Sequence, residues 1–377
     1  MGRVSAMGVS GVDVSGVDVA VIGAGIVGCM TAREVLDRWP GASVAVVEGD
    51  AVGSGASRRS AGLHFPRGAS TRVREMAGVS ELRYRALRAE LPGLPVYDVD
   101  TTVIAPGNAD GRLRQVYLPG AGLRRTDVVP EVLNGLPEGD GAWQVSGGQY
   151  ADVQGVAQAL AAALRPEVRF LEGTRVTGMV SGSDGVELDL SSGGTLRAAK
   201  VLLAPGPWVA DPAWASWLEP LGLRVKKVVA LHVERRPSPG DGVVVFEDED
   251  AFLLPVHHRG HWLFSYTCRQ WDVLPEQVPG HLTPVEIAEA HAALARFAPE
   301  LLPLSTTGRV FCDAYSPDRA PVVRAVDPHS NVVFAGAANG SGYRLAPAIA
   351  AEAAALLGPL HSSSTVPPRT VASRSFT

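Results

Sequence analysis

Asp18-Val-Ala-Val-Ile-Gly23-Ala-Gly25-Ile-Val-Gly28 is the stretch that decides the fold. Its first six residues are almost continuously apolar, which is typical of a buried strand. The residues from Ile26 to about Arg38 then have helical spacing and stop before Pro40. A second apolar run, Ser43–Glu48, follows. This order of strand, helix and strand predicts a βαβ unit and therefore a parallel sheet.

Three glycines give the unit the GxGxxG spacing: Gly23, Gly25 and Gly28. Such glycines permit a tight turn, let the backbone approach a pyrophosphate and allow close packing of helix on strand. Glu48 stands 20 residues after Gly28, where an acidic side chain accepts hydrogen bonds from a ribose and disfavours a 2′-phosphate. The pattern predicts a dinucleotide site. By itself it does not choose between NAD and FAD.

Composition narrows the class of protein. Apolar residues make up 46% of the 377 residues and charged residues 19%, which is typical of a folded chain long enough for two domains. A formal net charge of −5 provides no positive field, so neither nucleic acid nor an anionic membrane is expected as a partner. Three cysteines without CxxC spacing argue against a disulfide framework or zinc site, and no apolar run is long enough to span a membrane. We expect a cytoplasmic protein without a bound metal.

The chain leaves the first sheet after Glu48 and returns to it twice, unlike the regular alternation of a simple dehydrogenase. We therefore predict an α/β protein of two domains in an α+β arrangement, with a Rossmann-like domain and a mixed-sheet substrate-binding domain. The first would comprise residues 17–75, 145–210 and 325–358, and the second residues 76–144 and 211–324. A flexible leader (1–16) and a disordered tail (359–377) would flank them.

Four phrases in a fixed order carry a resemblance to a known family. They are VAVIGAGIVG with VVEGD, GASRRSAG at residues 55–62, VLLAPGPW at 201–208, and SPDRAP at 316–321 leading into FAGAANGSGYRLAP at 334–347. In this order the chain resembles the superfamily of FAD-dependent oxidoreductases that includes glycine oxidase, sarcosine oxidase and D-amino-acid oxidase. The resemblance covers residues 18–357 and implies FAD as the cofactor.

The resemblance also implies which residues hold the cofactor. Glu48 would bind the adenosine ribose, the three glycines the pyrophosphate, and the turn at residues 340–343 the flavin, at the positive end of a helix that favours negative charge on reduced flavin. The full set is Gly23, Gly25, Ile26, Val27, Gly28, Glu48, Gly49, Ser57, Arg58, Arg59, Ser60, Ala61, Gly62, Val176, Ala204, Gly206, Trp208, Gly336, Gly340, Ser341, Gly342, Tyr343 and Arg344. We expect noncovalent binding, because Cys312 is one residue out of step with the cysteine that sarcosine oxidases use.

Three residues are candidates for the substrate pocket. The resemblance implies that Arg344 binds the carboxylate of the substrate through its planar, permanently charged guanidinium group. It also places His64 and Tyr266 beside the substrate. The chain also departs from the family. Asp313 stands where the glycine and D-amino-acid oxidases carry a carboxylate-binding arginine, and so favours a cationic group on the substrate. No lysine occurs within residues 261–266, where sarcosine oxidases place the lysine that promotes reaction with oxygen.

The resulting hypothesis is oxidation of a C–N bond in an amino acid or N-substituted amino acid. Hydride would pass to flavin and an imine would form, so the protein needs to position its substrate and requires no nucleophile. The partners would be this small molecule and O2 or another electron acceptor. One alternative is a flavin monooxygenase, although Gly336 is followed by Ala337 and not by the aspartate of that class. Another is a catalytically silent FAD-binding subunit.

Overall fold

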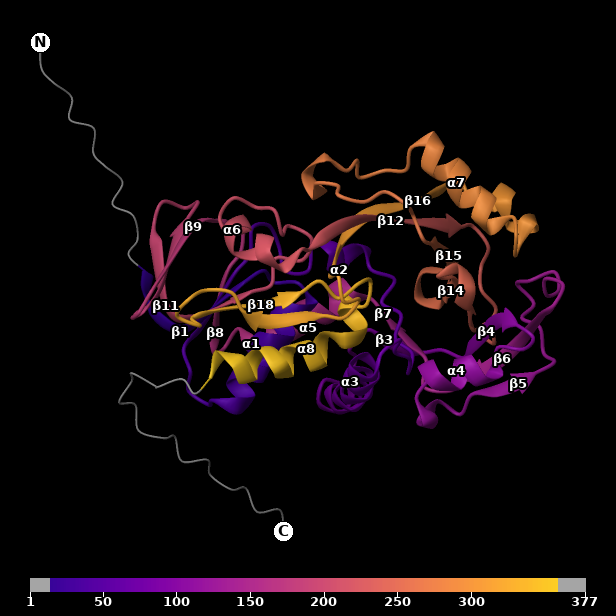
Figure 1. Ribbon diagram of the computed structural model, residues 1–377, viewed down its shortest axis with the longest axis horizontal. Helices are drawn as coiled ribbons and strands as arrows, with labels where there is room; N and C mark the ends of the chain where they lie inside the picture. Colours follow the sequence, from indigo (N-terminus) through magenta and orange to yellow (C-terminus); the bar gives the residue numbers. More distant parts are fainter. Residues whose placement is uncertain (1–13, 359–377) are drawn as a thin grey trace, which may run out of the picture.

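The computed structural model describes residues 14–358. Residues 1–13 of the expected leader, and the whole expected tail at 359–377, lie outside the described residues. Residues 14–16, which were also assigned to the leader, instead begin strand β1 (Val14–Ile22) and pair in parallel with strand β11 (Thr195–Leu203). Figure 1 shows an elongated molecule in which β1 and β11 lie in one half and the strands of a second sheet in the other.

The first of two eight-stranded sheets contains the predicted βαβ unit. Its order is β17-β18-β11-β1-β2-β8, with β9 and β10 attached to β11. Every pairing from β18 to β8 is parallel. The remaining bounds are β17 Val322–Ala325, β18 Val332–Gly336, β2 Val44–Val47, β8 Val168–Leu171, β9 Val176–Gly182 and β10 Gly185–Leu190. The Rossmann-like sheet agrees with the prediction, and β9 and β10 extend it as an antiparallel meander.

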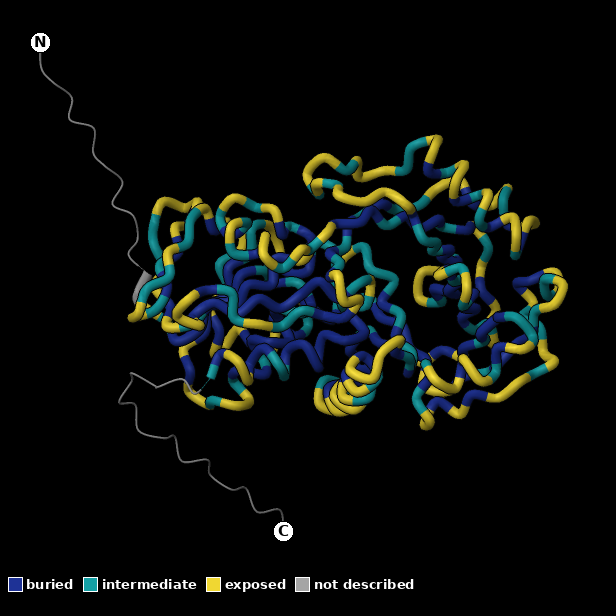
Figure 2. The backbone as a smooth tube through the Cα atoms, viewed as in Figure 1, coloured by how far each residue is buried: buried dark blue, intermediate teal, exposed yellow. Residues whose placement is uncertain are grey.

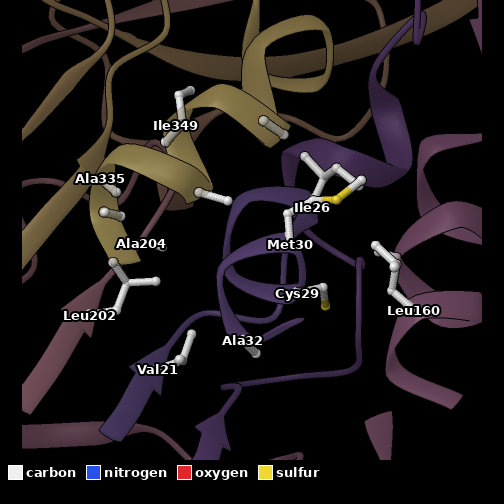
Figure 3. Close-up of a cluster of buried hydrophobic side chains, with 14 of the residues drawn as sticks. Val21, Ile26, Cys29, Met30, Ala32, Leu160, Leu202, Ala204, Ala335 and Ile349 are labelled. Carbon is white, nitrogen blue, oxygen red and sulfur yellow. The ribbon is translucent and has the colours of Figure 1, made fainter. Parts of the chain in front are cut away.

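Helices cover one face of this sheet: α1 (Ile26–Arg38), α3 (Thr71–Glu90), α5 (Val153–Leu164) and α8 (Gly342–Leu357). In Figure 3, Ile26 and Met30 of α1 lie between Ile349 of α8 on one side and Leu160 of α5 on the other. The helix α3 belongs to this core through Met76, Ala77, Tyr84 and Leu87. The predicted domain boundary at residue 75 therefore falls inside a helix of the nucleotide-binding half.

Each strand of the βαβ unit is buried on both faces. Val19 and Val21 pack toward the helices, whereas Ala20 and Ile22 pack toward the meander and the short helix α6 (Ala215–Leu218). This two-sided burial explains why the strands read as unbroken apolar runs in the sequence. Figure 2 shows the same strands as a dark, buried centre with exposed loops around it.

The second sheet has the order β16-β12-β15-β14-β13-β4-β6-β5. Its strands are β16 Thr307–Tyr315, β12 Arg224–Val233, β15 His261–Tyr266, β14 Ala251–Val256, β13 Val243–Phe246, β4 Thr101–Pro106, β6 Asp140–Val145 and β5 Arg124–Thr126. Helix α7 (Pro284–Leu294) packs on one face together with Leu231 and Phe264. Helix α4 (Asp110–Val116) packs on the other face, together with Ala230 and Leu263. The mixed sheet of the predicted second domain is confirmed.

Three short elements complete the connection between the sheets. Helix α2 (Ala56–Arg59) follows the glycine-rich loop, and β3 (Val96–Asp98) pairs with β7 (Gln149–Ala151). The sequence pattern indicates two strands at residues 195–199 and 201–204, but residues 195–203 form one continuous strand. The apolar spacing predicts a helix from Leu345, but α8 begins three residues earlier, at Gly342. This earlier start brings the first turn of α8 to the Gly340 turn.

Candidate active site

The glycine turn after β1 is shaped so that only glycine fits. Gly23 has φ +98° and a Cβ there would collide with the carbonyl oxygen of Ala204. A Cβ on Gly28 would collide with the carbonyl oxygen of Gly23, so this glycine lets α1 pack tightly on the strand. The backbone N–H of Ile26 donates to Ser57 Oγ at 3.0 Å. The other N–H groups of the first helical turn have no partner within the helix and can face a phosphate.

A cavity of about 400 Å³ lies at the carboxyl ends of β1, β2, β11 and β18. This is the edge where open parallel sheets bind their ligands. Most of the predicted cofactor residues line it: Gly23, Gly25, Ile26, Val27, Gly28, Glu48, Gly49, Ser57, Arg58, Arg59, Ser60, Val176, Ala204, Gly206, Trp208, Gly336, Gly340, Gly342 and Tyr343. The cavity and its glycine cradle fit a dinucleotide such as FAD.

Four predicted cofactor residues do not line this cavity. Gly62 has φ +65° and packs so closely on the carbonyl of Ala151 that a Cβ would collide with it. Ala61 packs against the core of the second sheet. Ser341 Oγ accepts a hydrogen bond from Arg344 Nη2, and neither residue lines the cavity. The structure thus places these four around the cavity rather than in its wall.

Sequence reasoning missed part of the wall. Some missed residues adjoin predicted ones in the chain, and their positions could have been inferred: Asp50, Ser54, Gly55, Ala56, Arg175, Pro205, Pro207, Ala335 and Ala337. No sequence motif indicated that Trp214 and Asp211 line the cavity. Trp214 is held at the cavity wall because its Nε1 donates a hydrogen bond to the carbonyl of Trp208 at 2.8 Å.

Glu48 lies beside the glycine turn, as predicted. Its Oε2 accepts from the N–H of Ala24 at 2.8 Å, and its Oε1 accepts from the N–H of Asp50 at 3.0 Å. Burial raises the pKa of the Glu48 carboxyl, against these two donors and Arg175, which lower it. Each carboxylate oxygen keeps a free lone pair, so both can still accept from the hydroxyl groups of a ribose.

The turn between β18 and α8 holds an unusual backbone conformation. Ala337 and Asn339 have φ values of 50° and 53°, which cost energy for residues with a Cβ. Asn339 stabilises the turn, because its Nδ2 donates to the carbonyl of Ala337 at 2.8 Å and its Oδ1 accepts from the N–H of Ser316 at 3.1 Å. This strained turn presents Ala337, Ala338 and Gly340 to the cavity.

Arg344 is buried in the first turn of α8, with 8% of its surface exposed. Its Nη1 donates to the carbonyl of Arg67 at 2.6 Å and its Nη2 to Ser341 Oγ at 2.7 Å, and the guanidinium lies 5.4 Å from the ring of Phe65. Among the described residues no carboxylate pairs with it. Burial and the neighbouring Arg67 lower the pKa of Arg344 to about 10. A buried cation without a counter-ion favours an anionic ligand.

Arg67 differs from Arg344 because it has a counter-ion within the protein. Its Nε donates to Glu247 Oε1 at 3.1 Å, and Tyr117 donates to the other carboxylate oxygen at 3.2 Å. The Glu247 side chain is only 4% exposed. This pair fixes the loop that follows α2 against the second sheet, and it leaves Arg344 without a directly paired carboxylate among the described residues.

His64 is fully enclosed and does not line the cavity. Neither ring nitrogen has a hydrogen-bond partner among the described residues, and the ring meets Tyr84 edge to face at 5.9 Å. Burial, followed by the charge of Arg344, lowers the pKa of His64 to about 4. The imidazole is therefore neutral and sits within the protein interior, so the structure does not place it against a substrate.

Tyr266 lies on the wrong face of its strand for a substrate pocket. It packs with the α7 side of the second sheet, and its hydroxyl donates to Glu289 of α7 at 3.4 Å. Because side chains alternate along a strand, the neighbours of Tyr266 face the other way. Tyr266 does not line the cavity, so the structure does not bring it to the cofactor site.

The pocket side of this sheet carries two charged residues instead. Asp313 lines the cavity, and Lys226 is its partner across the β12–β16 ladder. Strand β15 contains no lysine at the position where sarcosine oxidases carry one. The neighbouring strand β12, however, carries the buried ammonium group of Lys226. Cys312 points to the opposite face, lies 4% exposed in an apolar cluster and does not line the cavity.

These features define a class: a two-domain oxidoreductase built around a dinucleotide site. The model of the family described as FAD dependent oxidoreductase (DAO) matches residues 18–356. The chain belongs to this family, and FAD is its cofactor. The predicted family is thereby confirmed. No curated protein matches the sequence significantly.

Solved structures share the fold. Glycine oxidase from Geobacillus kaustophilus is 22% identical, with a TM-score of 0.75 over 91% of this chain and 95% of that one. NikD, an unusual amino acid oxidase essential for nikkomycin biosynthesis, is 19% identical, with a TM-score of 0.73 over 93% and 96%. L-proline dehydrogenase from P. horikoshii is 18% identical, with a TM-score of 0.75 over 91% and 94%. At these identities the likeness establishes the fold alone.

Across residues 14–358, no helix combines the length and apolar character needed to cross a membrane.

Proposed function

We propose that this protein oxidises the C–N bond of an amino acid or of an N-substituted amino acid to an imine. Bound FAD supplies the acceptor for the hydride that leaves the carbon next to nitrogen. The family supports flavin-dependent redox chemistry, and the fold neighbours include glycine oxidase, NikD and L-proline dehydrogenase, whose names specify amino acids or their oxidation. We place the protein in the cytoplasm, as a part of amino-acid or specialised metabolism.

The observation that carries the proposal is the burial of Arg344 without a directly paired carboxylate among the described residues. Its two hydrogen bonds to Arg67 and Ser341 fix the guanidinium but leave other N–H groups free. A substrate carboxylate would satisfy these donors and neutralise the cation. The residue lies in the first turn of α8, next to the Gly340 turn at the cavity, so a carboxylate held there would bring the adjacent carbon toward the flavin.

A panel of paired compounds tests this proposal. The FAD-loaded protein is mixed without oxygen with free, N-methylated, N-substituted and cationic amino acids, and each is matched by the amine that lacks its carboxylate. We expect the flavin to bleach with at least one amino acid and far more slowly with the matched amine. Bleaching by no compound favours a silent FAD-binding subunit. Equal bleaching by both members of a pair refutes the carboxylate requirement.

The same samples separate an oxidase from a dehydrogenase. After bleaching, air is admitted to one portion and an artificial electron acceptor to another. Rapid recovery of the yellow colour in air identifies O2 as the acceptor. Recovery only with the artificial acceptor identifies a dehydrogenase.

A further inference from the structure

Asp313 and Lys226 approach the cofactor cavity from two neighbouring strands. They are register partners in the antiparallel ladder of β12 and β16, and partners in such a ladder point their side chains to the same face. Asp313 lines the cavity. The strand pairing therefore places the ammonium of Lys226 beside a carboxyl, that of Asp313, which lines the wall of the cofactor cavity.

Neither group is neutralised by a direct contact. The Lys226 Nζ lies 5.2 Å from the ring of Trp271 and 5.5 Å from the ring of Tyr315, and it forms no salt bridge among the described residues. Its neighbour Lys227 faces the other way and pairs with Glu286 of α7. Aromatic faces hold the Lys226 ammonium by cation–π attraction and leave the Asp313 carboxylate without a direct partner.

The Asp313 carboxylate accepts no hydrogen bond from any described residue, although part of its surface remains exposed at the cavity. Burial raises the pKa of Asp313 to about 7, and the charge of Lys226 only partly opposes this rise. The other titratable groups nearby are Cys312 and Tyr315 on the same strand, Arg59 in the cavity wall, and Asp250, whose charge acts on Tyr315. A carboxyl in this position exchanges its proton near neutral pH.

An amino acid in water near pH 7 carries its nitrogen as ammonium, which has no lone pair to form a C=N bond. We propose that Asp313 removes one proton from the ammonium group of the substrate before its C–N bond is oxidised. This inference rests on the proposed function. An N–H bond breaks and an O–H bond forms on Asp313. The freed lone pair on nitrogen enters the C=N bond as hydride leaves the carbon for the flavin, and Asp313 later releases its proton to water.

Lys226 acts through Asp313 as a positioning residue. Its positive charge, fixed between Trp271 and Tyr315, favours the carboxylate form that accepts the proton. Without this charge the carboxyl would hold its proton to a higher pH. Lys226→Met should therefore move the pH dependence of flavin bleaching upward while leaving its plateau at high pH near that of the wild type.

The pH dependence of flavin bleaching tests the role of Asp313. FAD-loaded wild type, Asp313→Asn and Asp313→Glu are mixed anaerobically with saturating amino acid between pH 5.5 and 9.5. We expect the wild-type rate to rise with an apparent pKa of about 7. Asp313→Asn should bleach about 10²- to 10⁴-fold more slowly at pH 7, the usual range for general acid–base catalysis, and approach the wild type only where the amine is free in solution. Asp313→Glu should recover part of the rate.

A matched control removes an acid of the same kind elsewhere. Asp184 lies exposed in the turn between β9 and β10, so Asp184→Asn should keep the wild-type rate and pH profile. A second readout does not require turnover. Infrared spectra of the FAD-loaded proteins should show a carboxylic-acid C=O band that titrates near pH 7 in the wild type and Asp184→Asn but is missing from Asp313→Asn.

The outcomes separate this inference from the proposed function. If the wild type bleaches and Asp313→Asn has the same pH profile, the inference fails and the proposed function stands. A loss of rate that is equal at every pH also overturns it, because that result indicates a purely structural contact. If no amine bleaches the wild type, the proposed function fails, and the infrared band then reports only on the proton affinity of Asp313.

Discussion

The guanidinium of Arg344 donates a 2.6 Å hydrogen bond to the backbone carbonyl of Arg67, 277 residues away in the sequence. This contact ties the first turn of α8 to the loop that follows α2. It uses the carbonyl of Arg67 and not a side chain, so the Arg67 guanidinium remains free to pair with Glu247. Arg67 thereby has a counter-ion within the protein, whereas Arg344 has no paired carboxylate among the described residues, which supports the proposal that it binds the carboxylate of a substrate.

Replacement of Arg344 should weaken substrate binding more than flavin binding. Removing one partner of a buried, hydrogen-bonded charge pair costs about 2 to 5 kcal/mol, or roughly 30- to 5,000-fold in affinity. Arg344→Ala should keep its yellow colour but need far more substrate for anaerobic bleaching, and Arg344→Lys should recover part of the loss. Ser341→Ala serves as the control, since it removes one hydrogen bond and keeps the charge. Bleaching of Arg344→Ala at wild-type concentrations would contradict the carboxylate role.

Glu48 should be required for retention of FAD. Its carboxylate already accepts from Ala24 and Asp50, and loss of a charged hydrogen-bond acceptor costs about 1.5 to 3 kcal/mol. Glu48→Ala should release flavin on gel filtration, whereas Glu48→Gln should retain more, because an amide oxygen can still accept. Full flavin occupancy in Glu48→Ala would refute the ribose assignment.

Asn339 should hold the flavin-side turn in place. Asn339→Ala loses the hydrogen bonds to Ser316 and Ala337, and the alanine must also adopt a positive φ that Asn tolerates better. We expect stability to fall by about 1 to 3 kcal/mol and flavin to bind more weakly. Asn339→Gly separates the two causes, because glycine adopts the positive φ without strain but makes no side-chain bonds. Denaturant unfolding and flavin fluorescence titration measure both effects.

The flavin should be released by acid. Cys312 faces an apolar cluster on the far side of β16, and burial raises the pKa of its thiol to about 11, so it is neither placed nor ionised for attachment. Acid precipitation of the holoprotein should leave the yellow colour in the supernatant. Colour that stays with the pellet in the wild type and is lost in Cys312→Ala would show a covalent link through this residue.

The nucleotide-binding half could be predicted from sequence because its signals are local. A strand, a glycine turn, a helix and an acid at the next strand all lie between residues 18 and 48, and each has a specific steric or hydrogen-bonding reason. Gly23 and Gly28 illustrate this, since any side chain there would collide with a carbonyl oxygen. The role of Arg344 came instead from the family resemblance, and its binding of a carboxylate stays a prediction.

The substrate side could not be predicted equally well, because it depends on pairing between distant strands. Lys226 and Asp313 are 87 residues apart and meet only through the register of β12 and β16. A shift of one residue along a strand moves a side chain to the other face, and Tyr266, whose role the family resemblance implied, points to the α7 side. His64 was misplaced for another reason. A lone histidine in a loop carries no signal that separates a pocket from the interior.

Stability should report the proton on Asp313 independently of substrate. The folded protein holds the pKa of this carboxyl at about 7, whereas an unfolded chain releases the proton near pH 4. Between these values the folded state binds more protons than the unfolded state, so the free energy of unfolding falls as pH rises from about 4 to 7 and stays low above that range. Asp313→Asn removes this penalty, because its amide never ionises.

Denaturant unfolding of the FAD-loaded wild type and Asp313→Asn, at one fixed FAD concentration, measures this effect. The variant should gain stability relative to the wild type between pH 5 and pH 8. The gain should be at most about 1.4 kcal/mol per unit of pKa shift, and smaller because solvent at the cavity screens a partly exposed carboxylate. Asp184→Asn should show no such slope, since its carboxylate is exposed. A stability difference between wild type and Asp313→Asn that is constant with pH would place the pKa of Asp313 in the ordinary range and remove its capacity to exchange a proton at neutral pH.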